Sequence, residues 1–228
     1  MIASQEQLLE EGERLDKLRR SYDGDEAVDE SYVVLTIGAS LIATLGLLAN
    51  NAAVVIGAMV VASWILPLRA LVFGSLIGDK KLLLRALLTL SIGVTITTLL
   101  SMGLGLVAGN MNLLMVVPDE ITARLQPNLL DLGIALAAGA IATYAKVNPG
   151  AVSSMAGTAI AVALVPPVCV MGIMLAAGEL DDAQGAGLLF SANLLGILIG
   201  GITILFLQHV SLTSGKNFEH KIVHVYHY

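Results

Sequence analysis

The sequence predicts an all-α, polytopic membrane protein with six transmembrane helices, arranged as two inverted three-helix repeats. Three observations predict this class. The 228 residues have a mean hydropathy of +0.83 and are 56% hydrophobic and 13% charged, whereas a soluble domain carries about 25% charge. Six continuously apolar segments approach or exceed the roughly 20 helical residues that cross a bilayer. The two halves of the chain also resemble each other at a shift near 100.

The composition and residue types exclude several functional classes. So little charge excludes a soluble enzyme, a nucleic-acid-binding protein and a disordered chain. Cys169 is the only cysteine, which excludes a disulfide scaffold and a multi-cysteine metal site. The four histidines all follow the last apolar segment, and no Walker-type phosphate loop occurs. We therefore expect no catalytic residues, no cofactor, no metal site and no nucleic-acid partner.

Residues 1–30 form an acidic arm that holds ten of the 18 acidic residues. No basic stretch precedes an apolar run, so a cleaved signal peptide is not expected and the arm is predicted to be cytoplasmic. Within it, acid-before-base pairs four residues apart predict an amphipathic helix over Gln5–Arg20. This helix would either bind a cytoplasmic protein partner or another copy of the chain, or rest on the membrane surface.

The membrane domain is expected to cover residues 31–208. Its apolar runs are continuous rather than alternating, which favours helices over strands. Residues 209–228 follow as a cytoplasmic tail, extended over Ile222–Tyr228, where apolar and ring residues alternate. The six predicted spans are Tyr32–Ala49, Ala52–Ile77, Ala86–Ala108, Leu129–Ala145, Ala151–Ala177 and Gly187–Gln208.

The positions of Lys and Arg predict the topology of these six spans. Ten of the 12 basic residues lie on the side that receives both termini. The positive-inside rule therefore predicts that both termini are cytoplasmic. The opposite side carries Asp119, Glu120, Glu179, Asp181 and Asp182. These acids would form a mouth that concentrates cations, or they are ordinary loop residues.

The two repeats are predicted to cover residues 31–108 and 129–208. At a shift of 100, Pro67 corresponds to Pro167 and Gly78 to Gly178. Because each repeat has three spans, the second copy would be inverted in the membrane, as in many secondary transporters. Proline removes a backbone donor and clashes with the preceding turn, so Pro67 and Pro166-Pro167 predict kinks in the second and fifth spans.

These kinks would either line a solute path or only shape helix packing. Hydroxyl groups near the prolines could take up the freed backbone groups in a bilayer that offers no water. They belong to Ser63 in the first repeat and to Ser153, Ser154 and Thr158 in the second.

The remaining polar residues of the spans complete the predicted path. Asn50, Asn51, Ser191 and Asn193 offer neutral ligands. Asp131 lies in the first turn of the fourth span, where it would either stabilise the helix dipole or bind a cation or proton. Arg124 could pair with Asp131 if a short helix over Asp119–Gln126 folds back.

Gly196 and Gly200 have the spacing of a close helix contact. This contact would lie either within the chain or between subunits. We expect a homo-oligomer, because six short helices leave little interior for a pore in one subunit.

Several motifs together resemble a known family. They are Asn50-Asn51-Ala-Ala-Val-Val-Ile-Gly-Ala-Met, Gly78-Asp79-Lys80-Lys81-Leu-Leu-Leu-Arg85, Pro127-Asn128-Leu-Leu-Asp131, and Gly157-Thr-Ala-Ile-Ala-Val-Ala-Leu-Val-Pro166-Pro167. Over roughly Tyr32–Leu207 the chain resembles the uncharacterised prokaryotic membrane family called domain of unknown function 389. The resemblance implies a prokaryotic inner membrane or a thylakoid-type membrane.

We expect a small transporter or channel that passes a small ion or solute through the lipid bilayer. A path of hydroxyl and carbonyl groups suits a cation or a neutral solute, and transport would be passive or secondary-active. The alternative is a non-transporting assembly or regulatory subunit of a larger membrane complex, acting through residues 1–30.

Overall fold

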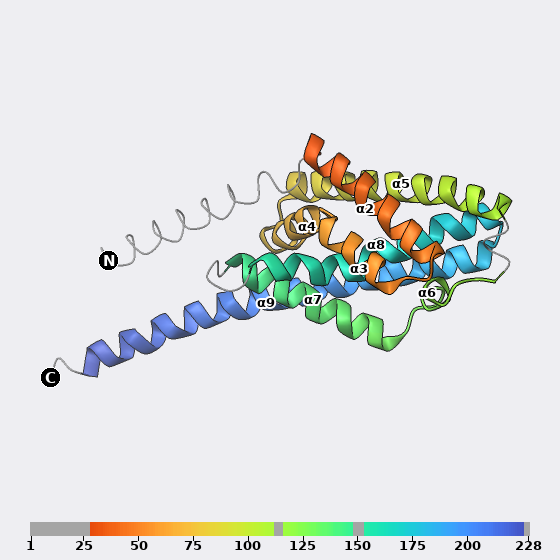
Figure 1. Ribbon diagram of the computed structural model, residues 1–228. Coiled ribbons are helices and arrows are strands. Elements are labelled where there is room, and N and C mark those ends of the chain that lie inside the picture. The colour runs from red at the N-terminus through yellow and green to blue at the C-terminus, as the bar shows by residue number, and fades with distance from the viewer. Residues whose placement is uncertain (1–27, 112–115, 148–152, 226–228) are drawn as a thin grey trace.

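The computed structural model describes residues 28–111, 116–147 and 153–225, and within them it contains helices and no strand (Figure 1). The all-helical prediction is therefore confirmed for this part of the chain. The acidic arm, with its predicted Gln5–Arg20 helix, lies outside the described residues. The helices are α2 (Glu30–Leu48), α3 (Ala52–Val61), α4 (Ile65–Ile77), α5 (Lys80–Asn110), α6 (Asp119–Thr122), α7 (Leu129–Val147), α8 (Ser153–Ala177) and α9 (Leu180–Val225).

Local signals set the boundaries of these helices. Asp29 caps α2, accepting a hydrogen bond from Tyr32 N at 2.7 Å. Asp79 caps α5 by accepting from two backbone N–H groups. The glycines that precede α5 and α9, Gly78 and Gly178, have left-handed φ angles of 69° and 81°. Glycine adopts this conformation without steric cost, so the chain turns at the same position before both helices.

Three helices are long and apolar enough to cross a membrane, namely α2, α5 and the Leu180–Leu207 part of α9. α3 and the Ile65–Ser75 part of α4 pass the same test together but are bent by 59°. α7 and α8 contribute the shorter apolar stretches Leu129–Ala145 and Leu164–Ala177. The protein is thus a membrane protein. Within the described residues three helices pass this test alone, or four if the bent pair is one span, and the six-span layout stays a prediction.

The second apolar segment is bent, but the break lies at Ala62–Trp64 and not at Pro67. The reason is that proline acts one turn before itself. Pro67 has no N–H with which to reach the carbonyl of Ser63, four residues earlier, and its ring clashes with that carbonyl. Leu66 N donates to the Ser63 carbonyl instead, at 3.3 Å. Pro67 itself lies in the first turn of α4, where a missing N–H breaks no helix bond.

α8, in contrast, continues as a helix through Pro166 and Pro167, so it has no break like that between α3 and α4. Every residue from Leu164 to Val170 is buried, and α8 packs against α2, α3, α4, α5, α7 and α9. Neighbouring helices on all sides let a membrane helix tolerate proline. α8 is therefore the central helix of the core.

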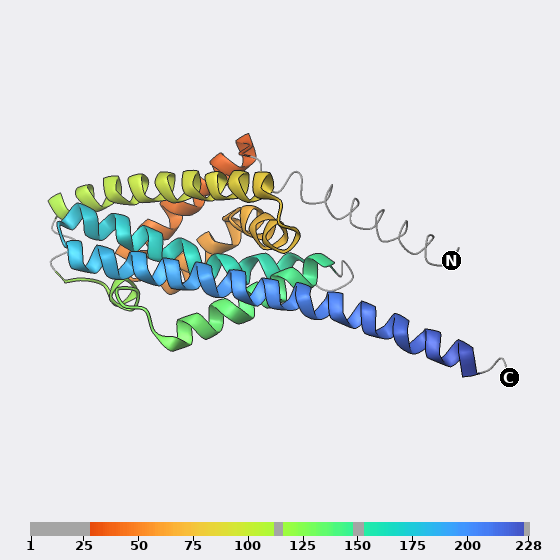
Figure 2. The same cartoon turned by 180° about the vertical axis from the view of Figure 1, so that it is seen from behind.

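The long helices and α3 run in two opposite directions, whereas α4, bent by 59° from α3, lies across them (Figures 1 and 2). α2, α5 and α8 run towards the end of the bundle where α6 lies. α3, α7 and α9 run back towards the end where α2 and α5 begin, and α9 continues beyond it. The extended conformation predicted over Ile222–Tyr228 is wrong as far as Val225, since α9 remains helical there. Extending an existing helix needs no new nucleus. The helix therefore continues into the segment in which apolar and ring residues alternate.

Candidate functional site

A stripe of polar side chains lies between α2 and α5, inside the apolar bundle. It consists of Tyr32, Thr36, Ser40 and Thr44 on α2 and of Thr89, Thr97 and Ser101 on α5; each is at most 2% exposed. We call these seven residues the polar stripe. The α2 members are four residues apart, which keeps them on one helix face. From Tyr32 to Thr44 they span about 18 Å at 1.5 Å per residue, more than half of a bilayer core of about 30 Å.

Two pairs of hydroxyl groups join α2 to α5 within the polar stripe. Ser40 Oγ lies 2.7 Å from Thr97 Oγ1, and Thr44 Oγ1 lies 2.7 Å from Ser101 Oγ. Ser40 and Thr44 donate their single hydroxyl hydrogens to the α2 carbonyls of Thr36 and Ser40. Because a hydroxyl has one hydrogen and two acceptor positions, the α5 hydroxyls must donate across the interface. Both pairs therefore satisfy their hydrogen bonds without water.

One end of the polar stripe meets the break between α3 and α4. The hydroxyl of Tyr32 donates to the carbonyl of Thr89 at 2.9 Å. Gly93 faces it, and a methyl group added there would overlap the Tyr32 hydroxyl and lie 3.2 Å from Trp64 Nε1. Trp64 is 1% exposed and packs edge-on against Phe190 of α9, with ring centroids 6.3 Å apart. The absence of a side chain at Gly93 thus allows both the polar stripe, at Tyr32, and the break, at Trp64, to approach α5 at the same place.

The other end of the polar stripe lies near α6. The thiol of Cys169 in α8 adjoins the hydroxyls of Thr44 and Ser101, and Cys169 is fully buried. Gly172, one turn later, contacts the same part of α5, because a methyl group there would lie 2.8 Å from Ser101 Cβ. α8 therefore covers this end of the polar stripe.

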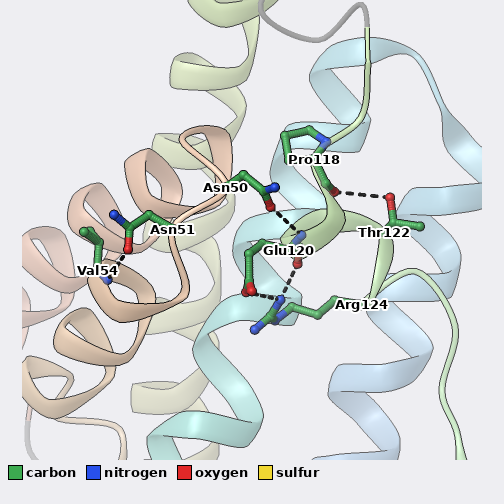
Figure 3. Close-up of polar contacts among 7 residues, drawn as sticks. All are labelled: Asn50, Asn51, Val54, Pro118, Glu120, Thr122 and Arg124. Carbon is green, nitrogen blue, oxygen red and sulfur yellow. Dashed lines mark hydrogen bonds and ion pairs between the residues drawn. The ribbon is translucent and has the colours of Figure 1, made fainter.

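The predicted Arg124–Asp131 ion pair is not formed, because each residue has a closer partner. Arg124 Nη1 lies 2.9 Å from Glu120 Oε2 and also donates to the Glu120 carbonyl (Figure 3). Asp131 Oδ2 accepts from Asn128 N at 3.3 Å, while Asn128 Oδ1 accepts from Asp131 N at 3.0 Å. This reciprocal pair is a capping box. The helix-start interpretation of Asp131 therefore fits the structure.

The two asparagines of the predicted path lie at the end of the bundle, in the turn between α2 and α3. Asn50 Oδ1 accepts from Glu120 N at 3.0 Å, and Asn51 caps α3 by accepting from Val54 N at 3.2 Å (Figure 3). Asn50 also has a φ of 50°, which asparagine tolerates better than most residues. Both side chains thus have local roles at the bundle end and are not near the middle of the bundle.

The remaining predicted path residues fall in different surroundings. Ser63 and Pro67 are buried at the break. Asn193 is 4% exposed on α9, whereas Ser191 is exposed and donates to the Gly187 carbonyl at 2.9 Å. Pro166 and Pro167 lie in the buried part of α8. Ser153, Ser154 and Thr158 lie in the first turns of α8, where the side chains are outside the described part of the structure.

The second half of the chain repeats the register of the polar stripe with glycines. At shifts of 99 and 100, the pair Thr44–Ser101 corresponds to Thr143–Gly201, and an added methyl at Gly201 would lie 2.8 Å from Thr143 Oγ1. Ser40–Thr97 corresponds in the same way to Gly139–Ile197, where an added methyl would overlap the Ile197 carbonyl oxygen. Equivalent residues therefore meet in both halves, by hydroxyls in one and by glycines in the other.

Gly196 and Gly200 make their close contact within the chain. An added methyl at Gly196 would lie 2.9 Å from Ala135 Cβ, and one at Gly200 would overlap the carbonyl oxygen of Leu136. Both contacts are to α7. Of the two interpretations of this spacing, packing inside the subunit is the one that the structure supports.

The hydroxyl pairs predict a measurable coupling. Thr44→Val and Ser101→Ala each remove one hydroxyl of a pair, so the double variant should lose less stability than the sum of the singles. The expected coupling is about 0.6 kcal/mol and at most about 1.7 kcal/mol, the range of interhelical hydrogen bonds in membranes. Unfolding in mixed detergent micelles measures it. Thr95→Val combined with Ser101→Ala is the control, since Thr95 is exposed and bonds only within α5, and its effect should be additive.

The chain has sequence similarity to a protein family and to a protein of Methanocaldococcus jannaschii. The family described as "Domain of unknown function (DUF389)" matches residues 59–199. An uncharacterized protein of Methanocaldococcus jannaschii is 28% identical over 203 residues, covering 88% of this chain and 62% of that protein. The chain thus spans less than two thirds of this relative's length. No solved structure is similar. Because the family match covers more than half of the chain, the protein belongs to the family of domain of unknown function 389.

Proposed function

We propose that the chain is an inverted-repeat membrane transporter or channel that passes a small ion or solute, passively or by secondary-active coupling. The observation that carries this proposal is the contact between a broken helix and the polar stripe at Gly93. In a bilayer, irregular backbone is tolerated only where it is buried in protein or lines a hydrated cavity. Broken helices at the interface of inverted repeats are where transporters bind their substrates.

Helix boundaries and packing support the inverted repeat. α2 and α7 have the same length of 19 residues, at a shift of 99. α5 and α9 begin at Lys80 and Leu180, each two residues after a left-handed glycine. The equivalent contacts Thr44–Ser101 and Thr143–Gly201 add a tertiary correspondence to the sequence one. In this repeat α3–α4 and α8 are equivalent, one broken and one continuous.

The proposed topology has six membrane crossings. Both ends of the membrane domain therefore lie on the same side of the membrane. The directions of α2, α5 and α8 against those of α3, α7 and α9 support it. So do the charges, because Lys80, Lys81 and Arg85 occupy the first turns of α5, whereas acidic residues surround the opposite end of the bundle. By the positive-inside rule the α5 start would be cytoplasmic.

In this mechanism the hydroxyl and carbonyl oxygens of the interior replace the water around a solute. The carbonyls at the end of α3 have no intrahelical partners, as at any helix terminus, and lie on the same broken segment as Ser63. The hydroxyl pairs bond to each other in the present structure, so the path along the polar stripe is closed. Transport requires the α2–α5 contact to loosen, whereupon each hydroxyl exchanges its partner for the solute.

Flux through proteoliposomes tests the proposal. Potassium, sodium and chloride are followed with ion-sensitive dyes, and urea and glycerol by light scattering. We expect one of these solutes to cross faster than through empty liposomes. Thr97→Val removes a hydroxyl of the polar stripe with little change in shape, and should alter the flux by about tenfold, since an unmade polar contact costs about 1–3 kcal/mol. Thr95→Val is the matched control on the exposed face of α5 and should leave the flux unchanged.

Equal effects of the two variants would contradict the path proposed here. The absence of flux for all five solutes would instead favour the second candidate, a non-transporting assembly or regulatory subunit. Deletion of residues 1–30 separates the two, because the arm is dispensable for flux in the first case and is the partner-binding segment in the second. The homo-oligomer stays a prediction from the sequence.

A further inference from the structure

The segment Pro118–Leu125, which we call the α6 segment, lies across one end of the bundle. Its backbone is held from the first half of the chain by Asn50, whose side chain accepts a hydrogen bond from Glu120 N at 3.0 Å (Figure 3). From the second half, Gly185 of α9 approaches so closely that an added methyl group would overlap the carbonyl oxygen of Leu125. Ile121, which belongs to this segment, has a fully buried side chain. The α6 segment is thus wedged between the two halves.

The polar stripe ends beneath this segment. Thr44 lies in the last turns of α2, and the α2–α3 turn that follows carries Asn50. The Thr44–Ser101 pair is covered by Cys169 of α8. Arg124 is the basic residue of the α6 segment, and its side chain extends towards Glu120, on the side of the α2–α3 turn (Figure 3).

The polar contacts that hold the α6 segment in place are few. Asn50 supplies one hydrogen bond. Arg124 and Glu120 form an ion pair with side chains 21% and 23% exposed, and partly exposed pairs of this kind are weak. A short segment that is held by the packing of Ile121 and Leu125 and by a few exposed polar contacts can open locally while the bundle remains folded.

We propose that the α6 segment is the gate at this end of the polar stripe and that Arg124 sets the charge preference of the gate. This inference rests on the proposed function and names its solute class. A fixed guanidinium beside a narrow polar path raises the energy of a cation there, as arginine does in aquaporin-type pores. In the closed segment Arg124 Nη1 pairs with Glu120 Oε2 at 2.9 Å, so the guanidinium acts on a solute when opening separates this pair. The gate therefore favours small neutral or anionic solutes over cations.

Cys169 allows the gate to be tested without knowledge of the solute, because it is the only thiol of the chain. The rates at which two small methanethiosulfonates modify Cys169, one anionic and one cationic, are measured on the full chain in lipid nanodiscs. Asn50→Gly removes the bond to Glu120, and glycine accepts the positive φ of this position. Asn51→Gly is the matched control, since Asn51 lies in the same turn but bonds only to α3.

We expect Asn50→Gly to raise both rates by about tenfold, as when one hydrogen bond that favours the closed state is lost, and Asn51→Gly to leave them within about twofold. Arg124→Gln should lower the ratio of the anionic rate to the cationic rate. Equal rates in the two glycine variants, or a Cys169 that reacts in none of them, would overturn the gate. An unchanged ratio in Arg124→Gln would overturn the charge preference.

Two further measurements keep the outcome unambiguous. If Asn50→Gly lowers the melting temperature, Glu120→Gln gives a second comparison, because it removes the charge that pairs with Arg124 without altering the α2–α3 turn. Cys169→Ser must abolish all labelling. Thiol access needs no flux, so a gate that opens in a protein without flux contradicts only the proposed function. Flux in a protein whose Cys169 access is unaffected by Asn50→Gly contradicts only the gate.

Discussion

Gly139→Ala is expected to lower the melting temperature of the protein by roughly 2–12 °C. The added methyl group would overlap the Ile197 carbonyl oxygen and lie 2.7 Å from the carbon atoms of the same residue. All of these atoms are backbone, so no side-chain rotation can relieve the overlap, and α7 and α9 must separate. Overpacking of this kind costs up to about 3 kcal/mol, and each kcal/mol corresponds to about 2–4 °C in a chain of this size.

The measurement is thermal unfolding in detergent, followed by the fluorescence of Trp64, the single tryptophan, which is buried. Gly133→Ala is the matched control on the same helix. Gly133 is exposed and nothing lies within 4 Å of an added methyl group. Alanine has the higher helix propensity, so this variant should melt no lower than the parent. A Gly139→Ala protein that melts with its control would show that α7 and α9 are not packed as described.

Gly93→Ala is expected to lower the free energy of unfolding by about 1–3 kcal/mol, and Tyr32→Phe to restore part of the loss. The new methyl group would collide with the Tyr32 hydroxyl, which cannot move away because it is buried and bonded to the Thr89 carbonyl. Phenylalanine lacks that hydroxyl. The double variant should therefore be more stable than the sum of the single effects predicts, by about 0.5–3 kcal/mol.

Unfolding of the four proteins of this cycle in mixed detergent micelles provides the test. Gly103→Ala is the control on α5, since Gly103 is exposed and has open space around it. Additive effects of Gly93→Ala and Tyr32→Phe would mean that Tyr32 does not fill the space opposite Gly93. That result would contradict the close approach of the polar stripe to the α3–α4 break at Gly93.

The sequence predicted where most of the helices lie, but not which side chains meet between them. Long apolar runs located α2 and α7 to within two residues at each end, because apolar length and capping residues act locally. The predicted span for α5 began six residues late, at Ala86 instead of Lys80. The bend in the second segment followed from Pro67, but its position required the hydrogen-bond geometry of the turn before the proline. The continuity of α8 depends on neighbours from the whole chain, which no local pattern contains.

The polar stripe was missed for a similar reason. Thr36, Ser40 and Thr44 recur every four residues, and so do Thr97 and Ser101, so the signal was present in the sequence. It became meaningful only when α2 and α5 were known to lie together in parallel. Arg124 was linked to Asp131 by separation along the chain alone, whereas Glu120 is one helical turn away and needs no long-range fold to reach it.

The position of α8 has a consequence for biosynthesis. α8 belongs to the second half of the chain, yet it packs against α2, α3 and α5 of the first half. When the first four helices have left the ribosome, the hydroxyls of α2 and α5 still lack the covering that α8 supplies. The first half therefore cannot mature independently, and insertion of the last third of the chain completes the interior of both halves.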